Sequence, residues 1–209
     1  MNANSELERW NGRLSAEGYV FGSAPNVFLA SQAHRLKPGM TGLSVADGEG
    51  RNSVWLARQG LRVSAFDFSP VGVHKARTLA ARAGVEVDYS VADIFEWDWD
   101  ARRYDCIAAI FIQFAAPAER QRIFQGFVRA LEPGGLLIMQ GYTPKQLEYG
   151  TGGPRRAENM YTAKLLRESF AMLEILHLAE HEDVVDEGRG HNGMSALIDM
   201  EARRPAPAS

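Results

Sequence analysis

Short apolar runs and amphipathic stretches of helical length alternate along the central part of the chain. The apolar runs lie, in chain order, at 43–46, 61–66, 85–91, 104–111 and 136–140. Stretches with helical spacing of apolar residues separate most of them, and one begins with an N-cap residue, Ser69, followed by Pro. Strands separated by helices of this length predict a parallel α/β sheet with right-handed crossovers.

The two ends of the chain have a different pattern. Residues 1–40 contain one amphipathic stretch, at 23–36, and no strand pattern. Residues 142–160 are rich in Gly, Tyr and Pro, which predicts a loop of the functional kind. Apolar runs at 173–184 and 194–202 are separated by only a short polar segment. So short a connection forces an antiparallel pair, so the last two predicted strands run in opposite directions.

Composition limits the class of protein. A chain of 209 residues suits one domain that buries a full core. The net charge of −3 offers no basic surface for nucleic acid or an anionic membrane. The polar N-terminus is unlike a signal peptide, and the lone Cys106 excludes an internal disulfide and fits a reducing cytosol. We therefore predict a cytoplasmic protein that binds neither nucleic acid nor membrane, and no Cys/His spacing predicts a metal.

The apolar run at 43–46 ends in a Gly-x-Gly turn, Gly48-Glu49-Gly50, which opens directly into a helical pattern. This strand–turn–helix order brings backbone close to a nucleotide-like ligand. Asp47 and Glu49 flank Gly48, and their charges repel a phosphate and attract a cation. The turn therefore predicts a site for a cationic cofactor.

Acidic residues also end the next two predicted strands. Asp67 ends the second strand, about 20 residues after the turn, a spacing that suits acceptance of hydrogen bonds from ribose hydroxyls. Asp93 follows the third strand, where a carboxylate can accept from the exocyclic amine of a base. Open parallel sheets bind ligands beyond the carboxyl ends of their strands. Acidic residues at three consecutive strand ends therefore indicate a nucleoside site.

In these motifs the chain resembles the class I S-adenosylmethionine-dependent methyltransferases. Residues 46–50 stand at that family's glycine-rich first motif, 63–67 at its second strand with the ribose-binding acid, and 91–94 at the stretch that holds adenine. Residues 104–107 and 131–136 match the fourth strand and the turn before the fifth. The resemblance implies a Rossmann-like, seven-stranded, mostly parallel sheet with helices on both faces and an antiparallel last strand. It also implies S-adenosyl-L-methionine as the cofactor.

A narrower resemblance, to the small tellurite-resistance and thiopurine-type methyltransferases, rests on residues 48–57 and 19–26. It implies that N-terminal residues cover the cofactor, so we expect one domain over 1–209 with residues 1–40 as cofactor and substrate cover. It also implies a small-molecule acceptor that is a soft nucleophile, such as a thiol or a chalcogen oxyanion. The sequence leaves monomer and homodimer open.

Two positions of the first motif depart from the family pattern. Ser44 stands where many members have an acidic residue, and Ala46 stands where many have Gly. Ser44 cannot supply charge to the ammonium group of the cofactor. Asp47, Glu49 or backbone carbonyls are the alternatives.

The acceptor side is expected in the loops at the same sheet edge. Tyr142 and Tyr149 follow the fifth strand, and Tyr19 and Phe21 belong to the expected cover, so these four are the substrate candidates. His191, the catalytic candidate, lies in a Gly-rich turn between the last two strands. It is either an exposed turn residue or a base or substrate contact. The expected cofactor-binding residues are Ala46, Asp47, Gly48, Glu49, Gly50, Asn52, Asp67, Phe68, Asp93, Ile94 and Phe111.

Two other functions fit this pattern. A nicotinamide-dependent oxidoreductase is disfavoured because Ser53 stands where the dinucleotide fingerprint has its third Gly, and because the acidic turn opposes a pyrophosphate. A non-catalytic regulatory module that binds S-adenosylmethionine stays open because of the departures at Ser44 and Ala46.

Overall fold

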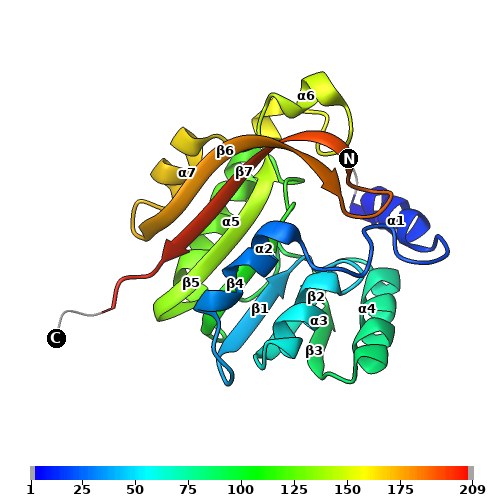
Figure 1. Ribbon diagram of the computed structural model, residues 1–209, viewed down its shortest axis with the longest axis horizontal. Helices are drawn as coiled ribbons and strands as arrows, with labels where there is room; N and C mark the ends of the chain where they lie inside the picture. Colours follow the sequence, from blue (N-terminus) through cyan, green and yellow to red (C-terminus); the bar gives the residue numbers. More distant parts are fainter. Residues whose placement is uncertain (1–2, 207–209) are drawn as a thin grey trace. The chain divides into compact units, whose positions relative to one another are not determined.

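The computed structural model describes residues 3–206, which form two compact units (Figure 1). The first unit holds the chain up to residue 97 together with 187–190, and the second holds the remainder. The expectation of one domain over 1–209, with 1–40 as its cover, stays a prediction.

Three parallel strands form the sheet of the first unit, in the order β3-β2-β1. They are β1 (Thr41–Val45), β2 (Arg62–Asp67) and β3 (Val87–Val91). The register pairs Leu43 with Ser64 and Ala65 with Tyr89. The helices of this unit are α1 (Ala3–Leu14), α2 (Val27–Ser31), the 3-10 helix η1 (Gln32–Arg35), α3 (Arg51–Arg58) and α4 (Pro70–Ala83).

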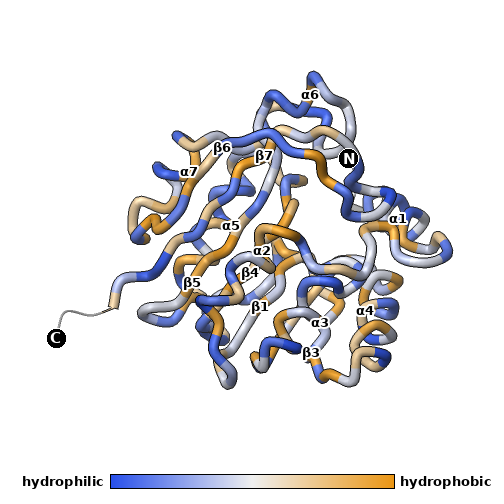
Figure 2. Tube along the Cα trace, viewed as in Figure 1, coloured by the Kyte–Doolittle hydropathy of each residue, from blue (hydrophilic) through white to orange (hydrophobic). Residues whose placement is uncertain are grey.

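Helix α4 begins and ends at its sequence signals. Ser69 Oγ accepts a hydrogen bond from Gly72 N at 3.1 Å, and Pro70 takes the first helical position. Gly84 ends the helix with a φ of +66°. Figure 2 shows hydrophobic and hydrophilic residues alternating along this helix, as an amphipathic helix requires.

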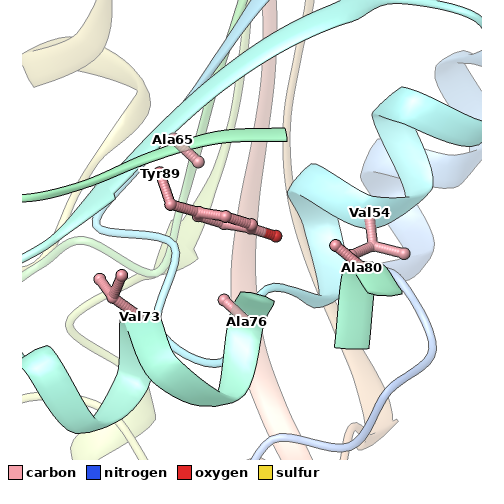
Figure 3. Close-up of a cluster of buried hydrophobic side chains, with 6 residues drawn as sticks. All are labelled: Val54, Ala65, Val73, Ala76, Ala80 and Tyr89. Atoms are coloured by element: carbon pink, nitrogen blue, oxygen red, sulfur yellow. The ribbon is translucent and has the colours of Figure 1, made fainter. Parts of the chain in front are cut away.

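The buried face of α4 packs with α3 and the strands β2 and β3 around the ring of Tyr89 (Figure 3). The Tyr89 hydroxyl lies 2.9 Å from the Ser53 hydroxyl at the start of α3, so the polar end of this buried ring has a partner. The cluster consists of Val54, Ala65, Val73, Ala76, Ala80 and Tyr89. This core fixes α3, and with it the turn that precedes α3, against the sheet.

Four strands form the sheet of the second unit, in the order β4-β5-β7-β6. Strand β5 is parallel to β4, and β7 is antiparallel to both β5 and β6. The strands are β4 (Tyr104–Ile110), β5 (Leu131–Tyr142), β6 (Glu174–Asp186) and β7 (Asn192–Arg203). The helices are α5 (Pro117–Ala130), α6 (Gln146–Tyr149), the 3-10 helix η2 (Ala157–Asn159) and α7 (Ala163–Ser169).

The predicted fold class is confirmed. The seven strands form one mostly parallel sheet in the order β3-β2-β1-β4-β5-β7-β6. The last strand lies between the fifth and sixth, and the short connection between β6 and β7 makes an antiparallel pair as predicted.

Two predicted element boundaries are wrong. The stretch 23–36 is not one helix, because Asn26 acts as an N-cap, its side chain accepting from Leu29 N at 3.0 Å, and the helix begins only after it. Strand β5 begins at Leu131 and not at 136, because the Pro-Gly-Gly segment continues the sheet: Gly134 N donates to Arg204 O at 2.8 Å. The sequence also missed α1, whose residues are mostly polar.

A glycine inside α5 allows close packing of an aromatic ring. A Cβ at Gly126 would lie 2.5 Å from Cγ of Trp99, a side chain that is buried against Phe127. We predict that Gly126→Ala lowers the free energy of unfolding by about 1–3 kcal/mol because the ring has to move. Gly12→Ala is the control: Gly12 lies in α1 with open space around its Cα, so the substitution should add about 0.5–1 kcal/mol. Urea denaturation of both variants measures the difference, and an unchanged stability of Gly126→Ala would contradict the packing.

Candidate functional site

The glycine-rich turn between β1 and α3 has backbone that only glycine adopts without strain. Gly48 and Gly50 have φ values of +61° and +94°. A Cβ at Gly50 would lie 2.7 Å from Cα of Ala76, whereas a Cβ at Gly48 would meet open space. Ala46 has a φ of +48°, which costs a residue with a Cβ about 1–2 kcal/mol. The turn is therefore tight on its α4 side and open at Gly48, where backbone can approach a ligand.

The carboxyl group of Asp47 is held by hydroxyl groups. Ser44 Oγ donates to its Oδ1 at 2.6 Å, Ser53 N donates to the same oxygen at 3.2 Å, and the Ser53 hydroxyl donates to Oδ2. Burial raises the pKa of Asp47 to about 7, against the effect of these bonds. At Ser44, where many family members have an acidic residue, the hydroxyl group therefore binds a carboxyl group that lies three residues later, at Asp47.

The Glu49 carboxylate binds the N-terminal segment and Lys75. Its Oε1 accepts from Lys75 Nζ at 2.8 Å, and its Oε2 accepts from Val20 N at 2.7 Å and from Phe21 N at 3.3 Å. The side chain is 1% exposed. The charge that the sequence predicted would attract a cationic cofactor is therefore neutralised by Lys75.

The carboxyl groups that end β2 and follow β3 lie where the sequence placed them. Asp67 accepts from Gly48 N and from Ser69 N, each at 2.8 Å, and burial raises its pKa. Asp93 is half-buried and accepts from Phe95 N at 3.0 Å. Ile94, the next residue, is buried. Asp67 thus ties the end of β2 to the glycine-rich turn directly.

Aromatic and amide side chains surround these strand ends. Phe68 follows Asp67 and is half-buried. Trp97 stacks on Phe66 of β2 with ring centroids 4.1 Å apart. Asn52 is buried at the start of α3, and its Oδ1 accepts from Asn26 N at 3.0 Å.

Sequence reasoning missed a buried ion pair beside Asn52. Arg51 Nη2 lies 2.6 Å from Glu187 Oε2, and both side chains are buried. Glu187 Oε1 also accepts from Asn26 Nδ2 at 2.9 Å and from Val27 N at 3.0 Å. No local pattern pairs residues so far apart in the chain, but a Glu inside a Gly-rich turn is the one available signal.

The second unit brings three predicted residues together. Phe111 follows β4 with a φ of +55°, and its ring stacks on Tyr142 at 4.7 Å and on His191 at 4.4 Å between centroids. The Tyr142 hydroxyl lies 2.6 Å from His191 Nδ1. Tyr142 is buried and His191 half-buried. Left-handed backbone at a non-Gly residue is typical of functional sites.

The other substrate candidates lie outside this cluster. The Tyr149 hydroxyl donates to Glu182 in an exposed pair. In the first unit, the ammonium group of Lys75 lies 5.7 Å from the ring centroid of Tyr19, and the Phe21 ring packs against Trp10. Their roles toward a substrate stay predictions.

Within residues 3–206, no group of three or more His, Cys, Asp or Glu side chains is placed to hold a metal ion. None of the helices in this described part is long and apolar enough to cross a membrane. Burial raises the pKa of the Cys106 thiol to about 12, which removes it as a nucleophile.

The central region of the chain is similar to known proteins. Residues 43–135 match the family model of a methyltransferase domain. The chain is 31% identical over 106 residues to the ubiquinone biosynthesis O-methyltransferase of Methylocella silvestris. The aligned stretch covers 47% of this chain and 40% of that protein. The chain is 29% identical over 103 residues to the uncharacterized protein Rv1403c of Mycobacterium tuberculosis, 49% of this chain and 37% of that protein. The matches thus span less than half the length of these curated relatives.

Solved structures share the fold over most of the chain. The N-methyltransferase NodS from Bradyrhizobium japonicum, in complex with S-adenosyl-L-homocysteine, has a TM-score of 0.71 at 15% identity and covers 98% of this chain and 100% of its own. TehB from Haemophilus influenzae has a TM-score of 0.69 at 17% identity, covering 84% and 61%. A protein of echinomycin biosynthesis that converts a disulfide bond into a thioacetal group reaches 0.76 at 18%, covering 97% and 93%. With the domain match, these folds confirm the resemblance to class I methyltransferases.

The titration of Asp47 gives a testable pH dependence. Because its folded pKa, about 7, lies above the ordinary value of 3.8 for an aspartate side chain, the folded state holds this proton more tightly, and the stability that the protonated form contributes is lost as pH rises through 7. We predict that Asp47→Asn gains stability relative to the wild type between pH 5 and pH 8. Urea denaturation at both pH values measures this gain, with Asp88→Asn, an exposed carboxylate of β3, as control. A constant difference between Asp47→Asn and the wild type would contradict the prediction.

Proposed function

We propose that the protein is an S-adenosylmethionine-dependent methyltransferase that acts on a small molecule. The observation that carries the proposal is the geometry of the first unit. A turn open at Gly48 and the carboxyl groups of Asp67 and Asp93 follow three adjacent parallel strands. This is the edge at which open α/β sheets bind nucleosides, and it lies inside the methyltransferase-domain match.

The residues present fit the proposed cofactor. Each oxygen of Asp67 accepts one backbone N–H and keeps a lone pair for a ribose hydroxyl. We propose that Asp93, which is half-buried after β3, and the backbone N–H of Ile94 bind the amine and a ring nitrogen of adenine. Gly48 leaves room for close approach of the ligand to backbone. When bound, S-adenosyl-L-methionine supplies a methyl group on a sulfonium, which is already a good leaving group.

The charge of Asp47 suits the same cofactor. Its carboxyl group receives three hydrogen bonds but has no Lys, Arg or His within ion-pair distance in the described part of the chain. A cationic ligand near the turn would favour the ionised form of Asp47. A phosphate would be repelled, which again disfavours a dinucleotide.

On the acceptor side, we propose that His191 receives the proton of the nucleophile. The Tyr142 hydroxyl fixes the imidazole through Nδ1, and Phe111 stacks on its ring. A thiol or chalcogen oxyanion barely needs this base, whereas a hydroxyl needs it. The positioned imidazole therefore supports an oxygen acceptor as the second candidate beside a soft nucleophile, and the O-methyltransferase relative points the same way.

We further propose a cytoplasmic protein without a nucleic-acid partner, because the net charge is −3. Monomer and homodimer remain alternatives. A regulatory module that binds the cofactor without turnover is the competing function, and transfer assays separate the two.

Calorimetric titration tests the cofactor site. We predict that S-adenosylmethionine binds with saturation below millimolar concentration, and that Asp67→Asn weakens binding about tenfold, because one charge-assisted hydrogen bond is worth about 1.5–3 kcal/mol. Asp88→Asn, on the exposed side of β3, should leave the affinity unchanged. The absence of heat at millimolar S-adenosylmethionine would reject the proposal that the protein is a methyltransferase.

Radiolabelled methyl transfer tests the acceptor side, with small thiols, selenite, tellurite, thiopurines and catechols as acceptors. We predict that His191→Ala lowers kcat about a hundredfold or more with a hydroxyl acceptor, the lower range of general-base effects, and far less with a thiol or chalcogen oxyanion, while cofactor affinity is unchanged. His74→Ala, an exposed histidine of α4, should have no effect. Equal turnover of His191→Ala and wild type with a hydroxyl acceptor would remove His191 from the mechanism. Cofactor binding without transfer to any acceptor would favour the regulatory module.

A further inference from the structure

Residues 16–21, which we call the strap, connect α1 to α2 without any helix or strand of their own. Such a segment is ordered only by its contacts with other elements. Backbone groups of the strap form hydrogen bonds with three distant segments of the first unit: α4, the glycine-rich turn and residues 187–190.

The first set of contacts comes from an ion pair. Lys75 Nζ, on α4, donates to Ala16 O at 2.8 Å and to Gly18 O at 2.6 Å. Its partner Glu49 accepts from Val20 N and Phe21 N, and the ion pair itself measures 2.8 Å. One buried carboxylate and one lysine therefore hold both ends of the strap.

The second set comes from residues 187–190. Gly190 N donates to Val20 O at 2.9 Å, and Arg189 Nη2 donates to Glu17 O at 3.0 Å. A Cβ at Gly188 would collide with the strap backbone, 2.6 Å from Val20 O. Residues 187–190 thus pack on the strap through glycines that leave no space for a side chain.

Glu49 belongs to the glycine-rich turn, but its side chain accepts hydrogen bonds from the strap. It lies between Gly48 and Gly50, so a change in the turn moves its carboxylate. Its three partners are all donors, and an amide at this position would have to point its NH₂ group at one of them. The bond between turn and strap therefore depends on the charge of Glu49.

We propose that Glu49 is a positioning residue that couples the glycine-rich turn to the strap, and that release of this contact controls exchange of the cofactor. The inference rests on the proposed function only in placing the cofactor at the turn. Lys75 is the partner of Glu49 in this contact. Because its side chain is 20% exposed, we expect water to enter on the side of Lys75 when the strap opens.

Hydrogen exchange and ligand dissociation together test the proposal. In the free protein, Glu49→Gln and Lys75→Met should each speed amide exchange of Val20, Phe21 and Gly190. In the complex, both should speed dissociation of S-adenosylhomocysteine, followed by stopped flow, by about tenfold, or about 1.4 kcal/mol. Glu6→Gln, which removes a half-buried carboxylate paired with the exposed Arg9 in the same unit, should change neither rate.

The two measurements, amide exchange and ligand dissociation, distinguish the strap proposal from the proposed function. Unchanged amide exchange in both variants overturns the strap contact, whether or not the cofactor binds. Faster exchange with unchanged dissociation overturns the coupling and leaves the proposed function intact, whereas no binding to the wild type rejects the proposed function alone. Lys75→Arg keeps the charge and should therefore leave both rates within about twofold of the wild type. If Lys75→Arg speeds both processes as much as Lys75→Met does, a role for the charge is contradicted.

Discussion

A buried carboxyl group has to receive hydrogen bonds or a counter-charge, and the first unit is organised around three that do. Asp47 binds the hydroxyls of Ser44 and Ser53 below the glycine-rich turn. Glu49 binds Lys75 and the strap. Glu187 binds Arg51 and the start of α2.

These three carboxyl groups hold the glycine-rich turn and the helix α3 that follows it, Glu187 through Arg51 at the start of α3. Through Asp47 the turn is fixed to the first turn of α3, and through Glu49 it is fixed to the N-terminal segment. Asp67 adds a fourth contact by accepting from Gly48 N. The proposed cofactor site is therefore preorganised by side chains whose charges are mostly satisfied within the protein. The remaining capacity for a ligand lies in the second lone pairs of Asp67 and in the half-buried carboxylate of Asp93.

The parts of the fold with local causes could be predicted from the sequence. Ser69, Pro70 and Gly84 act within one helix, and the carboxyl ends of β1, β2 and β3 follow from the order of strands and helices. The role of Glu49 could not be predicted, because its partners at positions 20 and 75 meet it only in the folded chain. The pair of Arg51 and Glu187 escaped prediction for the same reason.

The residues of the acceptor side were predicted one by one, without the contacts between them. Phe111, Tyr142 and His191 were singled out from separate loops, and the structure joins them into one stacked and hydrogen-bonded cluster. The positive φ of Phe111 gave no signal in the sequence, because an aromatic residue after a strand is normally extended. Tyr149 was predicted from its place after the fifth strand. It pairs with the exposed Glu182, and its role toward a substrate stays a prediction.

A crystal structure with S-adenosylhomocysteine bound tests the central claim most directly. The ribose hydroxyls should lie within hydrogen-bond distance of Asp67 and the adenine should lie at Asp93 and Ile94, while Glu49 keeps its bonds to Lys75 and Val20. A nucleoside bound away from Asp67, or an amino group bound to Glu49 with the strap displaced, would contradict it.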